Sequence, residues 1–263
     1  MPPPPNVTHP CFTPGVAWRQ VTVTRHAAYQ ASRLEACGVD PARWAGVAEP
    51  TLFGNDNFRL LSAEGAPIDG FVHMAQRLSQ TRPIALGETL TLSGRCTHAE
   101  ARPNGAFFIQ EFALADSAGQ VVLTAEHHRL KPAPKSAAPK PAALSPWATP
   151  EPPEFAEVAG RAMTPEAVTL FSSDVGNLLH FDPDFAQAMG FRAPIAQGLM
   201  AMAWMMGEMA CNRPPRTFDV ICRFRRPVFW DDTIRLQAAP GVFRVMTPAG
   251  KPAAELTVDA LTY

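Results

Sequence analysis

A proline-rich segment near the middle of the sequence limits the folds that this chain can adopt. Residues 131–153 read KPAPKSAAPKPAALSPWATPEPP, and the whole chain of 263 residues holds 28 prolines. Proline lacks a backbone N–H and favours extended conformations, so this segment is unsuited to a core helix or a central strand. We interpret it as a semi-rigid linker between an N-terminal domain over residues 1–130 and a C-terminal domain over residues 154–263. Each part is within the size range of an independent small domain.

The two predicted domains end in similar sequences. Residues 84–97 read IALGETLTLSGRCT, and a turn at 116–119 and the segment QVVLTAEHHRL follow. Residues 218–237 read FDVICRFRRPVFWDDTIRLQ, and a turn at 248–250 and the segment KPAAELTVDALTY follow. Polar and apolar residues alternate at 89–92 and 233–236, which predicts half-buried antiparallel strands. Because the two endings match in order, we infer a duplicated unit built mainly of strands.

Few segments have helical character. Residues 25–37 and 183–189 are predicted as helices, and residues 198–210 (GLMAMAWMMGEMA) are apolar nearly all round. A helix without a polar face must be buried on most sides. In a domain that otherwise consists of strands, the simplest place for it is inside a curled antiparallel sheet. For the first domain we take residues 25–37 as the central helix, and we expect this more polar segment to be less completely enclosed.

Composition excludes several function classes. Lys+Arg 23 against Asp+Glu 24 gives a net charge of −1, so we expect neither nucleic acid nor an anionic membrane as a partner. The N-terminal residues lack the basic start and apolar stretch of a secretory signal, and the five cysteines form no CxxC pair, so we expect a cytoplasmic protein. No cofactor is expected. His127 and His128 have no third ligand nearby in sequence, so a metal role is not expected for them.

One long motif connects the sequence to a known family. Residues 171–200 read FSSDVGNLLHFDPDFAQAMGFRAPIAQGLM, which resembles the signature of the MaoC-like, or hydratase-2, family of enoyl-thioester hydratases. The matching positions are Ser173, Asn177, His180, Asp182, Ala186, Gly190, Phe191, Ile195, Gly198 and Leu199. Residues 70–92 are similar to the degenerate N-terminal domain of two-domain members. The resemblance implies an α+β double hot-dog fold, with antiparallel sheets each wrapped on a helix and joined into one continuous surface.

The resemblance also implies a reaction. It is the reversible hydration of 2-enoyl thioesters to 3-hydroxyacyl thioesters, carried by coenzyme A or acyl carrier protein. Asp174 and His180 are the expected acid/base pair, and Asn177, Gln197 and Gly198 are the expected substrate-binding residues. The first N–H groups of the buried helix would bind the enolate-like oxygen, because they are unpaired and lie at the positive end of the helix dipole. We expect glycine at position 198 to let the thioester approach the helix closely.

The motif departs from the family pattern at three places. Val175 stands where the family has its catalytic aspartate, with Asp174 one residue earlier; Leu178 replaces a proline, and Gln197 replaces a histidine before Gly198. Two hypotheses therefore stay open: a hydratase, and a non-catalytic acyl-thioester binding or partner subunit. A hot-dog thioesterase is a lesser alternative, because its carboxylate would have to be Glu208, far along the helix. We expect a monomer with an internal pseudo-dimer, or a homodimer.

Two sets of residues outside the motif also have alternative interpretations. His73 and Arg77 are in a segment that can line an acyl tunnel, although we favour a packing role for both. Arg223, Arg225 and Arg226 either bind a phosphate of the thioester carrier or are simply exposed strand residues.

Overall fold

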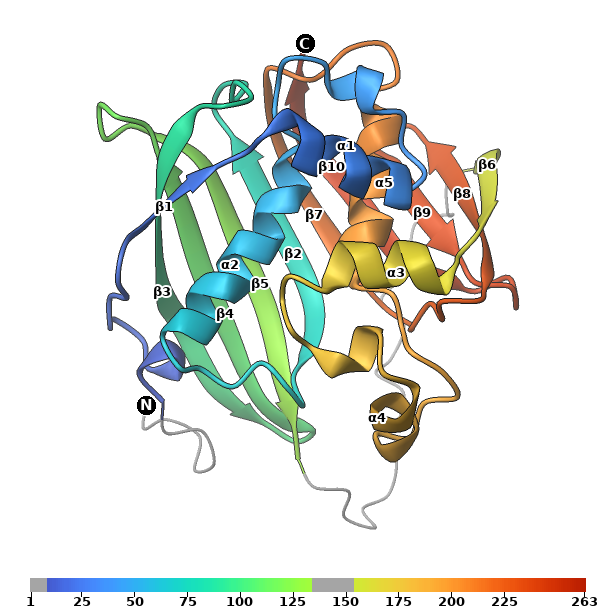
Figure 1. Ribbon diagram of the computed structural model, residues 1–263, viewed down its shortest axis with the longest axis horizontal. Helices are drawn as coiled ribbons and strands as arrows, with labels where there is room; N and C mark the ends of the chain where they lie inside the picture. The colour runs from blue at the N-terminus through green and yellow to red at the C-terminus, as the bar shows by residue number, and fades with distance from the viewer. Residues whose placement is uncertain (1–8, 134–153) are drawn as a thin grey trace.

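The computed structural model describes residues 9–133 and 154–263, here called the first and second halves (Figure 1). In these residues one ten-stranded sheet has the order β1-β3-β4-β5-β2-β7-β10-β9-β8-β6, and each pair of neighbouring strands is antiparallel. The strands of the first half are β1 (Val21–Thr24), β2 (Val72–Gln80), β3 (Thr89–Arg102), β4 (Gly105–Ala115) and β5 (Val121–Pro132). Those of the second half are β6 (Ala156–Ala162), β7 (Thr217–Phe224), β8 (Thr233–Ala239), β9 (Val242–Met246) and β10 (Pro252–Thr262).

The sheet is built from a repeated unit. In both halves the outermost strand is the first in sequence, the third, fourth and fifth follow, and the second lies at the centre of the molecule. The two units join where β2 pairs with β7, for example Leu78 opposite Val220. The predicted α+β double hot-dog fold and its continuous antiparallel surface are therefore confirmed.

The helices lie on one side of this sheet (Figure 1). They are α1 (Ala27–Ala36), α2 (Phe53–Ala63), α3 (Pro165–Ser172), α4 (Pro183–Ala188) and α5 (Gly198–Met209). Short 3₁₀ helices are η1 (Pro10–Phe12), η2 (Pro41–Trp44), η3 (Pro50–Leu52) and η4 (Leu178–His180). Across residues 9–133 and 154–263, none of the helices combines the length and the apolar character that crossing a membrane requires.

The central helix of the first half is α2, so the prediction that residues 25–37 fill this place is wrong. Those residues do form helix α1, but it contacts α3 and α5, whereas α2 lies along strands β2 to β5 (Figure 1). Residues 53–63 gave a weak helical signal because Gly, Asn and Asp have low helix propensity. Their polar side chains are buried and bonded: Asn55 donates to the Phe171 carbonyl at 3.0 Å, and Asp56 pairs with Arg25.

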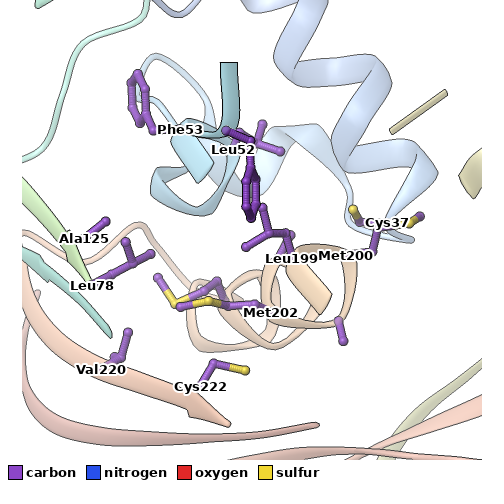
Figure 2. Packing of buried hydrophobic residues seen from close by; sticks show 14 of the residues in the cluster. Cys37, Leu52, Phe53, Leu78, Ala125, Leu199, Met200, Met202, Val220 and Cys222 are labelled. Atoms are coloured by element: carbon purple, nitrogen blue, oxygen red, sulfur yellow. The ribbon is translucent and has the colours of Figure 1, made fainter. Parts of the chain in front are cut away.

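Helix α5 is buried as its sequence predicted. Its methionines lie in the main hydrophobic core, and Met202 is fully buried (Figure 2). At its start, Leu199 packs on Gly54 of α2 so closely that a Cβ atom at Gly54 would be 2.6 Å from the Leu199 Cδ1 atom. The starts of the two central helices therefore meet at the boundary between the halves.

The first two residues of the predicted linker, residues 131–153, lie in a strand. Strand β5 runs to Pro132, so Lys131 and Pro132 belong to the sheet. Pro132 is tolerated there because β2 ends opposite Leu130, which leaves Pro132 paired only with Gly105 of β4. Residues 134–153 of the predicted linker lie outside the described residues.

Candidate active site

A cavity of about 270 Å³ lies where the two halves meet, at the start of α5. The second half contributes the loop around His180 and the first two turns of α5. The first half contributes Phe58 of α2, His73 of β2 and Arg129 of β5. Neither half encloses this cavity alone, so any chemistry in it depends on the whole chain.

His180 is held in one defined orientation at the cavity wall. It ends the short helix η4, whose N-cap is Asn177; the Asn177 Oδ1 atom accepts a hydrogen bond from the Leu179 N–H at 3.0 Å. The Nδ1 atom of His180 lies 2.7 Å from the carbonyl oxygen of Ile195. A carbonyl can only accept, so Nδ1 carries the hydrogen and Nε2 of the neutral ring is left as an acceptor.

The electrostatic surroundings keep His180 neutral. Burial lowers its pKa to about 4, although the bond to Ile195 opposes that shift. The Nε2 atom has no hydrogen-bond partner within the described residues. At neutral pH the ring therefore presents an unprotonated nitrogen that is able to take a proton from a molecule in the cavity.

The start of α5 offers hydrogen-bond donors to the same cavity. Gly198 and Leu199 both line it, and in the described parts of the chain their N–H groups donate to no other atom. Such groups lie at the positive end of the helix dipole and stabilise negative charge on an oxygen. They are the expected donors to a developing oxyanion.

Gly198 is glycine for a reason that the sequence did not indicate. A Cβ atom at this position would lie 2.7 Å from the Cδ1 atom of Phe224, whose ring also lines the cavity. A side chain at this position would therefore require the Phe224 ring to move. Close approach of the thioester to Gly198 stays a prediction.

Gln197 has unused hydrogen-bonding capacity. Its side chain lines the cavity and is 5% exposed, and neither its amide nitrogen nor its amide oxygen has a partner among the described residues. Buried polar groups are nearly always bonded, and leaving one unsatisfied costs about 1–3 kcal/mol. The amide is thus available to a polar group of a bound molecule.

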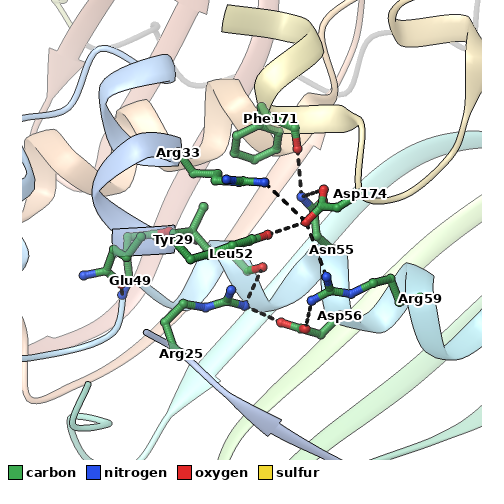
Figure 3. Close-up of polar contacts among 11 residues, drawn as sticks. Arg25, Tyr29, Arg33, Glu49, Leu52, Asn55, Asp56, Arg59, Phe171 and Asp174 are labelled. Carbon is green, nitrogen blue, oxygen red and sulfur yellow. Dashed lines mark hydrogen bonds and ion pairs between the residues drawn. The ribbon is translucent and has the colours of Figure 1, made fainter. Parts of the chain in front are cut away.

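Asp174 forms hydrogen bonds and ion pairs with side chains of the first half (Figure 3). Its carboxylate accepts hydrogen bonds from the Tyr29 hydroxyl at 2.6 Å and from the Asn55 amide at 3.2 Å. The guanidinium groups of Arg59 and Arg33 lie 3.5 and 3.9 Å from its Oδ2 atom. Asp174 therefore bridges the second half to α1 and α2 of the first half.

The structure gathers four of the five predicted site residues in one cavity. Its lining includes Asn177, His180, Gln197 and Gly198, whereas at the fifth position Val175 lines the cavity in place of Asp174. Among the described residues of that lining there is no carboxylate. In residues 9–133 and 154–263, no three His, Cys, Asp or Glu side chains are grouped to hold a metal ion.

Sequence reasoning missed the contribution of the first half. His73, for which we favoured packing, lines the cavity and has no partner for its Nε2 atom, while Arg77 pairs instead with Asp219. Arg129 lines the cavity as well. A signal for Arg129 was its alternation in β5 with the buried Ala125 and His127, which puts polar residues on an inward face.

Comparison with known proteins identifies the domain that carries His180 and α5. Residues 150–245 match the family model described as "MaoC like domain". Residues 150–245 are a MaoC-like domain. This match confirms the resemblance predicted from residues 171–200. No curated protein matches the chain in sequence.

Several solved structures resemble this chain over more than nine-tenths of its length. HtdX from Mycobacterium tuberculosis is 19% identical with a TM-score of 0.73, covering 91% of this chain and 98% of that one. A MaoC-like dehydratase from Phytophthora capsici is 18% identical with a TM-score of 0.70, covering 95% and 98%. The peroxisomal multifunctional enzyme type 2 from Drosophila melanogaster is 20% identical with a TM-score of 0.70, covering 92% and 48%. At these identities the likeness shows a shared fold.

Proposed function

We propose that this protein catalyses the reversible hydration of 2-enoyl thioesters to 3-hydroxyacyl thioesters, with His180 as the acid/base residue. The observation that carries the proposal is the hydrogen bond from His180 Nδ1 to the Ile195 carbonyl. This bond leaves Nε2 unprotonated in the cavity at the start of α5. The MaoC-like domain match and the structural relative from Phytophthora capsici, described as a MaoC-like dehydratase, support the reaction class.

In the proposed reaction the thioester carbonyl oxygen binds the N–H groups of Gly198 and Leu199. A water molecule hydrogen-bonded to His180 Nε2 attacks the β carbon, and Nε2 takes its proton. The electron pair of the C=C bond moves to the α carbon and the carbonyl oxygen, where the helix donors stabilise the enolate. The imidazolium then gives its proton to the α carbon, so that one water molecule has been added across the C=C bond.

The low pKa of His180 suits the second proton transfer. An imidazolium with a pKa of about 4 is a stronger acid than an ordinary one, so it returns the proton readily. The amide groups of Asn177 and Gln197 are close enough to the cavity to hold the water or the new hydroxyl. In this scheme one histidine performs both transfers, and Asp174 positions the loop from outside the cavity.

The carrier of the acyl group is part of the proposal. Arg225 and Arg226 are exposed on the cavity lining, where a phosphate of coenzyme A or of a carrier-protein phosphopantetheine can bind. We also propose that the two predicted domains, residues 1–130 and 154–263, act as one unit in a monomer or a homodimer. The cytoplasmic location expected from the sequence belongs to this proposal.

A panel of trans-2-enoyl-CoA substrates tests the reaction by loss of absorbance of the conjugated thioester. Wild-type protein is expected to turn over at least one chain length. His180→Ala is expected to lower kcat/KM by about 10²–10⁴-fold, while His98→Ala, on an exposed residue of β3, leaves it unchanged. Full activity of the His180→Ala variant contradicts the proposed site.

The second candidate is an acyl-thioester binding protein without catalysis. The lack of a carboxylate on the described cavity lining favours it, because hydration usually employs one group to activate water and another to protonate carbon. Wild-type protein that binds saturated acyl-CoA but hydrates no enoyl-CoA supports this alternative over the hydratase.

A further inference from the structure

Arg129 is a buried positive charge at the cavity wall. Its side chain is 1% exposed, and no carboxylate in the described residues pairs with it. Its Nη1 and Nη2 groups donate to the Gln110 side-chain oxygen and the Ile68 carbonyl, each at 3.2 Å. The guanidinium also lies 4.4 Å from the centre of the Phe71 ring. Every partner of this charge is therefore neutral.

Burying a guanidinium among neutral groups costs free energy. Moving an ion out of water costs several kcal/mol unless an opposite charge compensates it, and burial lowers the pKa of Arg129 to about 10. At neutral pH the group remains charged. A neutral glutamine can donate a hydrogen bond to a carbonyl without this cost, so a structural role alone does not account for an arginine here.

The position of Arg129 relates it to the reacting end of the cavity. Arg129 on β5 is the direct cross-strand neighbour of His73 on β2. The His73 ring lies 4.9 Å from the ring of Phe224 on β7, and Phe224 packs against Gly198 at the start of α5. Strand β5 is two strand spacings from β7, or about 10 Å. A short acyl group whose carbonyl binds at Gly198 can thus extend toward Arg129.

We propose that Arg129 binds a carboxylate at the far end of the acyl group, so that the substrate is a monothioester of a short unsaturated dicarboxylic acid. This inference rests on the proposed hydratase function for the identity of the reaction, and on the cavity alone for the carboxylate. The Nε2 atom of His73, beside Arg129, is unpartnered and can donate a further hydrogen bond to the same group in the neutral tautomer that carries its hydrogen on Nε2. A guanidinium is well matched to a carboxylate because it can donate two parallel hydrogen bonds.

Arg161 provides an internal comparison. It lines the same cavity from β6, and none of the described carboxylates pairs with it. It is only half-buried, and its Nη2 group donates to the Ala36 carbonyl at 2.8 Å. Its charge is therefore better hydrated than that of Arg129, and we assign the carboxylate to Arg129.

Binding of unreactive saturated thioesters tests the inference without requiring turnover. Isothermal titration calorimetry compares succinyl-CoA with butyryl-CoA and adipyl-CoA with hexanoyl-CoA, each pair being equal in length and differing by the terminal carboxylate. Wild-type protein is expected to bind the carboxylate-ended member of at least one pair at least ~10-fold more tightly. Arg129→Gln is expected to abolish the preference, and Arg129→Lys to weaken it.

Two matched variants control for the loss of one positive charge. Arg161→Gln changes the comparison residue, and Arg95→Gln changes an exposed residue of β3; both are expected to keep the preference. Equal affinities within both pairs overturn the inference, as does a preference that survives in folded Arg129→Gln or that is lost in Arg161→Gln. A crystal structure of wild type with the tighter ligand decides the matter even if the Arg129 variants fail to fold, since the carboxylate must contact the guanidinium.

The outcomes separate this inference from the proposed function. Hydration of crotonyl-CoA without any carboxylate preference keeps the hydratase and removes the Arg129 subsite. An Arg129-dependent preference without hydration of any enoyl-CoA, including the carboxylate-ended ones, keeps the subsite and removes the hydratase.

Discussion

The carbonyl oxygen of Ile195 accepts the Nδ1 hydrogen of His180 at 2.7 Å. Ile195 is itself fixed, because its N–H donates to the Leu179 carbonyl at 3.2 Å and its backbone bridges to Phe229. The ring of His180 is therefore held by the segment just before α5. Its tautomer follows from that backbone contact, without help from a carboxylate.

The pH dependence of activity follows from this arrangement. His180 must be unprotonated to accept a proton from water, and its pKa is lowered to about 4. We expect the acidic limb of kcat/KM to fall near pH 4, well below the value of about 6.5 for an ordinary histidine. Initial rates in overlapping buffers measure it. A limb near 6.5 contradicts the buried, neutral ring as the catalytic base.

The stability of the protein should also depend on pH through histidines whose surroundings disfavour the charged ring. Burial lowers the pKa of His180 to about 4, of His73 to about 3, and of His127 well below its usual value. The unfolded chain then binds more protons than the folded chain below pH 6.5, so the free energy of unfolding falls as pH decreases from about 6.5 to 4. Chemical denaturation across this range measures the slope. His127→Asn should flatten the slope, and a slope unchanged in that variant contradicts the assignment.

Asp174 gives a prediction that separates structure from chemistry. Asp174→Asn removes the negative charge near Arg33 and Arg59, which we expect to cost about 1–3 kcal/mol in the free energy of unfolding. Turnover per folded molecule should change by only a few fold, since the carboxylate does not line the cavity. A loss of 10²-fold or more in kcat, with stability retained, restores Asp174 as the acid/base partner that the motif suggested.

A double-mutant cycle locates the partner of Asp174. Tyr29→Phe removes the hydroxyl that donates to Asp174 at 2.6 Å. If this bond joins the halves, the double variant should lose less stability than the sum of the two single variants. Thermal melting of the four proteins measures the coupling, and strict additivity argues against an energetic link.

Position 198 tests why a glycine is needed there. Gly198→Ala puts a methyl group 2.7 Å from the Phe224 ring, so we expect lower stability and lower activity. Phe224→Leu in the same chain should recover stability, because the conflict is with the ring. Failure of the second change to recover any stability shows that something other than Phe224 excludes a side chain. Melting temperatures of both variants and of Phe224→Leu alone complete the comparison.

Assembly is checked by sedimentation velocity. One chain already contains both units that line the cavity, so a monomer or a dimer is expected at micromolar concentration. An obligate higher oligomer contradicts the idea that the internal pair replaces a dimer of single units.

The sequence predicted those parts of the fold whose hydrophobic pattern lies within one continuous segment. Helix α5 was evident because it is apolar all round, and the strand endings because polar and apolar residues alternate. Helix α2 was missed because Asn55 and Asn57 are compensated by Phe171 and His127, which are remote in sequence. A pattern within residues 53–63 contains no information about those partners.

The candidate site divides in the same way. The loop motif predicted that His180, Asn177, Gln197 and Gly198 belong together, and they line one cavity. The contacts of Asp174 were not predictable, since they are made by α1 and α2 of the other half. Whether the five residues act as proposed stays a prediction for the experiments above.

The two halves contribute different parts of the cavity lining. The loop with His180 and the start of α5 lie in residues 154–263, while His73 and Arg129 lie in residues 9–133. Under the proposed function, substitutions on β2 and β5 are expected to change which acyl groups bind and to leave the proton-transferring His180 in place. If the proposal holds, new substrate preferences can be sought by randomising the inward positions of β2 and β5, without changes to the residues of the second half that line the cavity.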